Sequence, residues 1–146
     1  MNKVVVLSLG LLLALFSCSC SKANASDDNV STTNGAKPNV VTMTDDSALR
    51  PGMKPETLTI IDFNATWCGP CKIFKPVFYQ ASARFPDVRF ISADVDNLQA
   101  TAMAFGIRAV PTVIFIKPDG STSQYIGTED IMPEDKFFNL VQKHLK

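Results

Sequence analysis

The sequence predicts an α/β fold, a small domain in which helices cover a central β-sheet. Three observations lead to this prediction. Short β-branched runs alternate along the chain with longer segments of helical periodicity, as in strands joined by helical crossovers. Crossovers of this kind are right-handed and favour a largely parallel sheet with helices on both faces. Near the end of the chain, two strand-like runs flank a tight-turn signal, which predicts a hairpin and therefore one antiparallel edge.

The first half of the domain contains two expected strands and one expected long helix. A short strand is predicted over 40–43, and a short helix or turn over 45–49. The nearly continuous apolar run at 58–64 is rich in β-branched residues, which predicts a strand buried on both faces. A helix over 70–84 should follow. Pro76 should kink this helix without ending it, because the apolar spacing continues beyond that residue.

The second half repeats the alternation and then closes with a hairpin and a helix. The expected elements are a strand over 88–93, a helix over 98–105, strands over 112–116 and 123–126, and a helix that begins near Pro133. Gly106 is placed to end the second helix. The run Pro118-Asp119-Gly120 is a tight-turn signal between the last two strands.

Composition excludes several classes of function. Hydrophobic residues make up 46% of the 146, which excludes disorder throughout and suits one domain. The 14 basic residues only balance 14 acidic ones, whereas a nucleic-acid binder needs a basic face. The only histidine is His144, which argues against histidine-based catalysis and metal sites. Four cysteines in two close pairs are too few for a disulfide-stapled miniprotein. The chemistry should therefore come from thiols or carboxylates, with no metal or other cofactor.

Residues 1–20 have the features of a signal peptide. Lys3 supplies a positive start, and the apolar run at 4–16 is shorter than the roughly 20 residues that span a bilayer. Leu15-Phe16-Ser17-Cys18 resembles a bacterial lipobox, in which the cysteine is lipidated and becomes the new N-terminus. We therefore expect lipidation at Cys18, export to the periplasmic side, and a lipid anchor that holds the protein on a membrane face.

Two other uses of this segment stay open. An ordinary signal peptide could be cut near Ala23-Asn24-Ala25, and Cys18 could pair with Cys20, although one intervening residue closes a very tight ring. Residues 21–39 are polar and predict a flexible tether, because they hold too little apolar surface to offset the entropy of ordering. Residues 40–146 remain for a single compact domain, which we expect to be a monomer.

One motif carries recognisable chemistry. The run Trp67-Cys68-Gly69-Pro70-Cys71 follows the expected buried strand and opens the next helix. The helix dipole and free backbone N–H groups favour a thiolate there, so the pKa of Cys68 should fall below the usual value of about 8.5. Cys68, at the exposed tip, should attack a disulfide, and Cys71, one turn further on, should resolve the mixed disulfide. Two alternatives stay open: half of a zinc site, although zinc needs about four ligands, and an inert structural disulfide.

The segment from Phe63 to Lys72 resembles the active site of the thioredoxin family. Agreement at a distance extends the resemblance. Asp62 lies where thioredoxins carry a buried Asp, the run at 106–112 resembles their cis-proline loop, and Gly127 lies where a glycine lines the substrate groove. The resemblance covers residues 40–146. It implies the thioredoxin fold, a central mixed five-stranded sheet flanked by helices, and a redox-active disulfide between the two cysteines of the motif.

The resemblance also implies a role for the buried acid. Asp62, in an apolar strand beneath the helix start, would have its pKa raised by desolvation. It would take the proton of Cys71, through a water, as Cys71 resolves the mixed disulfide on Cys68. The alternative is an Asp at a strand end that faces solvent. The Lys that some thioredoxins place near this Asp is Ser92 here, so the proton path should be tuned differently.

The remaining site residues implied by the resemblance line a substrate groove. They are Trp67, which would cover the disulfide with a flat apolar surface, Gly69 and Pro70 between the cysteines, Val110 and Pro111 in a cis peptide that exposes backbone to a substrate strand, and Gly127. Simpler alternatives are a plain core tryptophan, a proline that merely opens a helix, and an ordinary trans proline at position 111.

The expected function is a thiol–disulfide oxidoreductase outside the cytoplasm, a protein-disulfide reductase of the thioredoxin type. Gly69-Pro70 resembles the dipeptide of reducing thioredoxins, so reduction or isomerisation of disulfides in exported proteins is expected rather than net oxidation. Electrons would come from a transmembrane thiol donor. Two rivals are a binding or chaperone module with an idle disulfide, and a reductase specialised for one substrate. The chain has no room for the insertion that such specialised reductases often carry.

Overall fold

The computed structural model describes residues 37–146, which form one five-stranded sheet and three helices. The elements are β1 (Val40–Thr42), β2 (Thr59–Asn64), α1 (Gly69–Arg84), β3 (Arg89–Asp94), α2 (Gln99–Ala104), β4 (Thr112–Ile116), β5 (Thr122–Ile126) and α3 (Glu134–Leu145). The expected signal peptide over 1–20, the lipidation candidate Cys18 and nearly all of the expected tether lie outside the described residues. No helix within the described part combines the length and apolar character needed to span a bilayer.

The five strands form a mixed sheet in the order β1-β3-β2-β4-β5. β1, β3 and β2 run parallel, but β4 runs antiparallel to β2, and β5 runs antiparallel to β4. The antiparallel hairpin at one edge is confirmed, but the parallel direction that alternation implied for β4 is wrong. The mixed sheet implied by the family resemblance is confirmed. Because β4 is antiparallel to β2, it starts at the end of the sheet where β2 and β3 finish. The connection over 95–111, which contains the six-residue α2, therefore begins and ends at that same end of the sheet.

The expected elements are otherwise present, with their ends shifted by a residue or two. The segment 45–49, for which a short helix or a turn was expected, contains a turn, so the second alternative is confirmed. There, Asp45 accepts hydrogen bonds from the backbone and the hydroxyl of Ser47, a local pattern that competes with helix formation. α1 continues through Pro76, which confirms that this proline does not end the helix.

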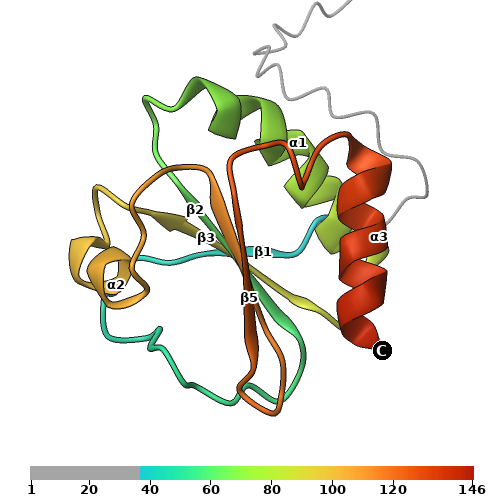
Figure 1. Ribbon diagram of the computed structural model, residues 1–146, viewed down its shortest axis with the longest axis horizontal. Coiled ribbons are helices and arrows are strands. Elements are labelled where there is room, and N and C mark those ends of the chain that lie inside the picture. The colour runs from blue at the N-terminus through green and yellow to red at the C-terminus, as the bar shows by residue number, and fades with distance from the viewer. Residues whose placement is uncertain (1–36) are drawn as a thin grey trace, which may run out of the picture.

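The sheet has a separate apolar core on each face. α1 and α3 cover one face and α2 covers the other, as Figure 1 shows. β2 contributes to both cores, because Ile60 packs on the side of α1 and α3 while Ile61 packs on the side of α2. This arrangement confirms a strand buried on both faces. The same alternation places Asp62 on the face of Ile60, beneath α1.

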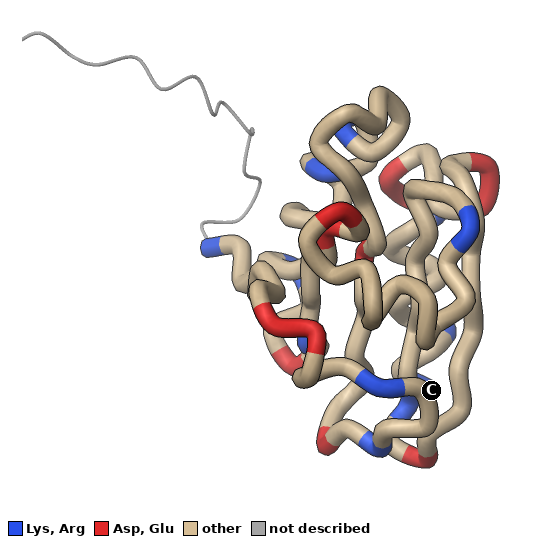
Figure 2. Tube along the Cα trace, turned by 90° about the vertical axis from the view of Figure 1, so that its left-hand side faces the viewer, with Lys and Arg blue, Asp and Glu red and all other residues tan. Residues whose placement is uncertain are grey.

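Charged residues of both signs are spread over the described part of the molecule. Figure 2 shows acidic and basic residues interspersed along the trace rather than gathered by sign. The balance in the whole sequence, 14 basic against 14 acidic residues, has the same character. Net charge therefore does not mark a functional site on this molecule. The candidate site is instead the pair of cysteines at the junction between β2 and α1.

Candidate active site

A disulfide between Cys68 and Cys71 occupies the start of α1, with the two Cα atoms 5.3 Å apart. Cys68 is the residue that caps the helix, and its Sγ accepts a hydrogen bond from the backbone N–H of Cys71 at 3.1 Å. Pro70 occupies the first turn, where a missing N–H leaves no helical hydrogen bond unmade. The first turn contains no acidic residue. Backbone donors and the positive end of the helix dipole therefore both face Cys68, and both favour a thiolate when the pair is reduced.

The two cysteines are less exposed than the sequence suggested. Only 4% of Cys68 and 5% of Cys71 is accessible, so the expectation of Cys68 at an exposed tip is wrong. The two cysteines pack together with Ala65, and Val110 closes the cluster from the loop before β4. The flanking Trp67, Gly69 and Pro70 remain exposed. The disulfide is therefore buried next to an exposed rim formed by these three residues.

Asp62 is a buried acid on the central strand. Only 3% of the residue is exposed, so the solvent-facing alternative is wrong. Loss of hydration raises its pKa from 3.8 to about 7, against the opposing effects of a hydrogen bond from Asn64 and the positive charge of Lys75. A carboxyl group with a pKa of about 7 exchanges protons readily at neutral pH, as a general base requires.

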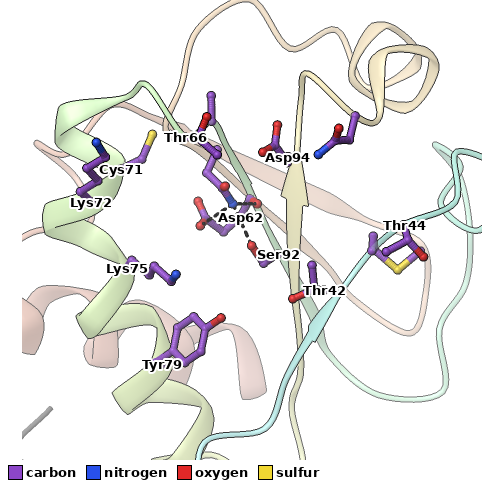
Figure 3. A pocket seen from close by; sticks show the side chains of 14 residues that line it. Thr42, Thr44, Asp62, Thr66, Cys71, Lys72, Lys75, Tyr79, Ser92 and Asp94 are labelled. Carbon is purple, nitrogen blue, oxygen red and sulfur yellow. Dashed lines mark hydrogen bonds between the residues drawn. The ribbon is translucent and has the colours of Figure 1, made fainter. Parts of the chain in front are cut away.

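Asp62 and Cys71 share a hollow of about 710 Å³ that opens between α1 and the strands β1 and β3. We call it the side hollow. Figure 3 shows Lys75 and Tyr79 directed into it from α1, with Ser92 on the opposite wall. The hollow thus joins the carboxyl group, the second cysteine and solvent on one side of the helix. The residues of the exposed rim, Trp67, Gly69 and Pro70, do not line this hollow.

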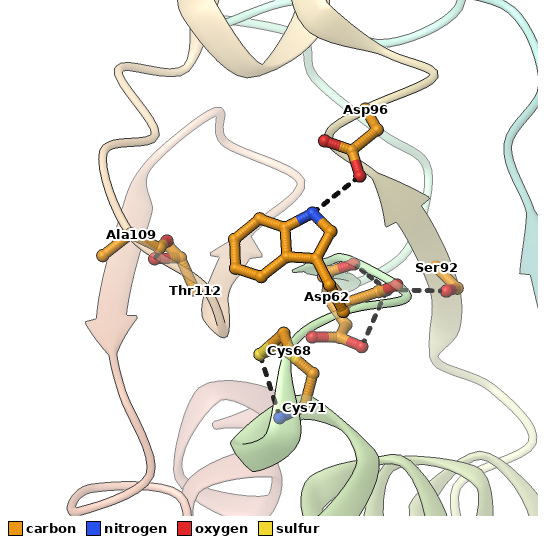
Figure 4. The surroundings of a disulfide bond; sticks show 9 residues. Asp62, Cys68, Cys71, Ser92, Asp96, Ala109 and Thr112 are labelled. Atoms are coloured by element: carbon orange, nitrogen blue, oxygen red, sulfur yellow. Dashed lines mark hydrogen bonds between the residues drawn. A yellow bond between two sulfur atoms is a disulfide. The ribbon is translucent and has the colours of Figure 1, made fainter.

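Trp67 forms one wall of the rim. It is 67% exposed, so the plain-core alternative is wrong. The indole Nε1–H donates to a carboxylate oxygen of Asp96, 2.8 Å away, as Figure 4 shows. This contact fixes the edge of the indole and leaves an apolar surface open beside the disulfide.

The opposite wall is the loop that precedes β4. The peptide bond between Val110 and Pro111 is cis, so the trans alternative is wrong. The backbone N–H of Gly127 donates to the carbonyl of Pro111 at 2.8 Å, which ties the loop to the end of β5. Gly127 has φ 74°, a left-handed conformation that glycine adopts without strain. The structure thus brings together every site residue expected within the domain, from three segments far apart in the chain.

Three contributors to the site were not foreseen. Asn64 donates hydrogen bonds to Asp62, Lys75 places a positive charge near that carboxyl group, and Asp96 holds Trp67. Asn64 had a visible signal, because it repeats the polar character of Asp62 two residues later on the same face of an apolar strand. The other two gave no signal, because their partners are set by how α1 and the loop after β3 approach the site.

Comparison with known proteins gives one consistent result. The family model described as thioredoxin matches residues 39–143, more than half of the chain. An H-type thioredoxin from Picea mariana is 39% identical over 83 residues, which cover 57% of this chain and 66% of that protein. A thioredoxin from Gallus gallus is 38% identical over 86 residues, which cover 59% of this chain and 82% of that protein.

Solved structures agree with the sequence comparison. The thioredoxin of Malassezia sympodialis superimposes with a TM-score of 0.64 at 30% identity, covering 76% of this chain and 95% of that one. A thioredoxin of Nicotiana alata gives a TM-score of 0.63 at 29% identity, covering 78% of this chain and 99% of that one. The chain therefore belongs to the thioredoxin family, and at Cys68 and Cys71 it carries the centre of a thioredoxin-type disulfide oxidoreductase.

Proposed function

We propose that this protein reduces or isomerises disulfides of exported proteins outside the cytoplasm. The observation that carries the proposal is the division of the site into two sides. Cys68 caps a helix beside the substrate rim, whereas Cys71 shares the side hollow with the buried Asp62. One cysteine is thus placed to meet a substrate and the other to lose a proton.

The reaction has two exchanges. The Cys68 thiolate attacks one sulfur of a substrate disulfide, a Cys68–substrate bond forms, and the other substrate sulfur leaves as a thiolate. Cys71 then attacks Cys68 while its proton passes to Asp62, and the substrate leaves as a second thiolate. Two electrons have moved from the dithiol to the substrate, and both substrate thiolates take protons from solvent. Cys68 and Cys71 end as the disulfide seen in the structure.

Two features favour reduction over net oxidation. The dipeptide Gly69-Pro70 resembles that of reducing thioredoxins, and the relatives at 38–39% identity are themselves named thioredoxins. Stable reduction outside the cytoplasm needs electrons from across the membrane, so the proposed partner is a transmembrane protein with its own thiol pair. The proposed location rests on the signal-peptide features of 1–20 and the lipobox-like cysteine Cys18.

The reduction potential of the Cys68/Cys71 pair, measured against glutathione, tests the direction. We expect a value near the roughly −270 mV known for a thioredoxin. A value toward about −120 mV would instead show an oxidant whose reduced form is stabilised. The variant Cys68→Ser/Cys71→Ser is the control for a binding or chaperone role, because such a role would survive in it.

Trapping in cells tests the partners and the location. Cys71→Ser should hold mixed disulfides through Cys68, and we expect both exported proteins and one membrane protein among them. Cys68→Ser is the matched control and should trap neither. Cys18→Ser should abolish labelling by a radioactive fatty acid and release the protein from the membrane. A soluble wild-type protein without label would contradict the lipid anchor while leaving the redox function in place.

A further inference from the structure

We propose that Asn64, anchored by Ser92, is the positioning residue that holds one oxygen of Asp62 and leaves the other oxygen to take the proton of Cys71. The inference deepens the proposed function and rests on it. The structural observation behind it is a group of hydrogen bonds that connect Asn64 with Asp62 and Ser92, drawn in Figures 3 and 4.

The side-chain amide nitrogen of Asn64 lies within hydrogen-bonding distance of three acceptors, which share its two hydrogens. Its Nδ2 lies 3.1 Å from Oδ2 of Asp62, 3.0 Å from the backbone carbonyl of Asp62, and 2.9 Å from the hydroxyl of Ser92. A carbonyl oxygen only accepts, so the amide must present its nitrogen to this cluster. With the nitrogen of the amide oriented in this way, Oδ2 of Asp62 accepts a hydrogen bond from Asn64.

The sheet register sets this geometry. Asp62 on β2 is paired directly with Ser92 on the parallel strand β3, and Asn64 lies two residues further along the same face of β2. Ser92 therefore reaches Asn64 from the neighbouring strand and fixes the amide from a second direction. Two strands hold the cluster, so the orientation of the carboxyl group does not depend on a loop.

The second carboxyl oxygen is placed differently. Oδ1 of Asp62 is buried and has no hydrogen-bond partner among residues 37–146. Asp62 and Cys71 both line the side hollow. The other charged and titratable groups that line the side hollow are Cys71, Lys72, Lys75 and Tyr79 on α1, and Asp94 at the end of β3. Because Oδ2 already accepts from Asn64 and Oδ1 has no partner in the described residues, we assign the incoming proton to Oδ1.

The proton balance of the resolving step follows. The S–H bond of Cys71 breaks and its proton passes to Oδ1, while the electron pair of sulfur forms the bond to Cys68. The bond between Cys68 and the substrate breaks, and the substrate sulfur leaves with that electron pair as a thiolate. Asp62 then returns the proton to solvent through the side hollow, away from the bound substrate. Asn64 donates throughout and neither gains nor loses a proton.

The first test is the titration of Asp62 in the oxidised protein, followed by the ¹³C shift of its carboxyl carbon. The cysteines do not titrate in this state, so the curve reports the acid alone. We expect Asn64→Ala to raise the midpoint by about one pH unit, because the charged form loses its donor. Ser92→Ala should raise it by less. Asn97→Ala is the matched control, since Asn97 lines the same hollow and is not a partner of Asp62 within the described chain.

The double variant decides whether Ser92 acts through Asn64. In the Asn64→Ala background, Ser92→Ala should add no further shift of the midpoint. The pH profile of the resolving step, measured by stopped-flow mixing of the reduced protein with a disulfide peptide, should move upward in parallel with the midpoint. An unchanged midpoint in Asn64→Ala, or a full additional shift in the double variant, would overturn the inference. If the wild type reduces no disulfide, the proposed function fails, and the titration of the oxidised protein still stands.

Discussion

At the scale of single residues, the site depends on an acid kept away from water. Asp62 has a pKa raised to about 7 by burial, so near neutral pH it is charged in only part of the molecules. A group of this kind suits proton transfer and costs stability, because the unfolded chain ionises it with no loss of hydration. Function and stability therefore oppose each other at this residue.

Asp62→Asn should stabilise the oxidised protein in a way that depends on pH. The unfolded carboxyl group titrates near 3.8 and the folded one near 7. The wild type should therefore lose stability as the pH rises through this window, by about 4 kcal/mol in total. Urea unfolding at pH 4, 6 and 8 would measure the effect, with nearly equal stabilities at pH 4 and the largest gain for the variant at pH 8. A difference that stays constant from pH 4 to 8 would contradict a raised pKa.

Asp96→Ala should free the indole of Trp67. The contact between them is a single hydrogen bond of 2.8 Å at an exposed site, so binding of protein substrates should weaken by about two- to tenfold. Trp67 is the only tryptophan, and its fluorescence should become easier to quench with acrylamide. Asp96→Asn is the matched control, because its amide oxygen still accepts the bond. Equal effects of both substitutions would show that charge matters rather than the bond.

At the scale of elements, sequence patterns predicted the order of strands and helices along the chain but did not predict the direction of every strand. Periodicity and turn residues predicted nearly every strand and helix, because side chains repeat every two or every 3.6 residues whatever the partner. The same signals did not predict the direction of β4. That direction is set by the pairing of β4 with β2, and alternation alone does not distinguish a crossover from a connection that begins and ends at the same end of the sheet. The family resemblance supplied the mixed sheet that periodicity missed.

Phe137→Ala should separate the packing of α3 from the redox chemistry. Phe137 is fully buried and contacts the rings of Phe74, Phe78 and Phe115. Its truncation should cost about 3–5 kcal/mol of unfolding free energy. The reduction potential should stay unchanged, because none of these rings contacts the disulfide cluster within the described residues. Phe138→Ala is the control, since this half-buried ring should cost clearly less. A shifted potential in Phe137→Ala would connect α3 to the site.

At the scale of the whole molecule, three distant segments build one site. The redox motif could be predicted from local sequence, and the cis-proline loop and Gly127 from family resemblance. The contacts of Asn64 and Asp96 could not, because they depend on the final distances between strands and loops. The described part of the chain contains two complete cores around one sheet, and both are built within residues 40–146.

A shortened chain of residues 37–146 should therefore fold and retain disulfide reduction in solution. We expect the same midpoint of urea unfolding and the same rate of insulin reduction as for a chain of residues 21–146. Both core clusters and all three segments of the site are present in this part. A lower midpoint for the shortened chain would show that residues before 37 contribute to the stability of the domain.

The central position of β2 has a consequence for the choice of substrates. This strand is hydrogen-bonded along both edges, by β3 on one side and β4 on the other. Its amide hydrogens should exchange with solvent only when the whole sheet opens. The cysteine motif thus begins a few residues beyond the slowest-exchanging part of the molecule and keeps its shape from one turnover to the next. Any change of conformation on binding should therefore occur in the substrate. Disulfides in locally unfolded segments should react first, because such segments adapt to the site at the lowest cost.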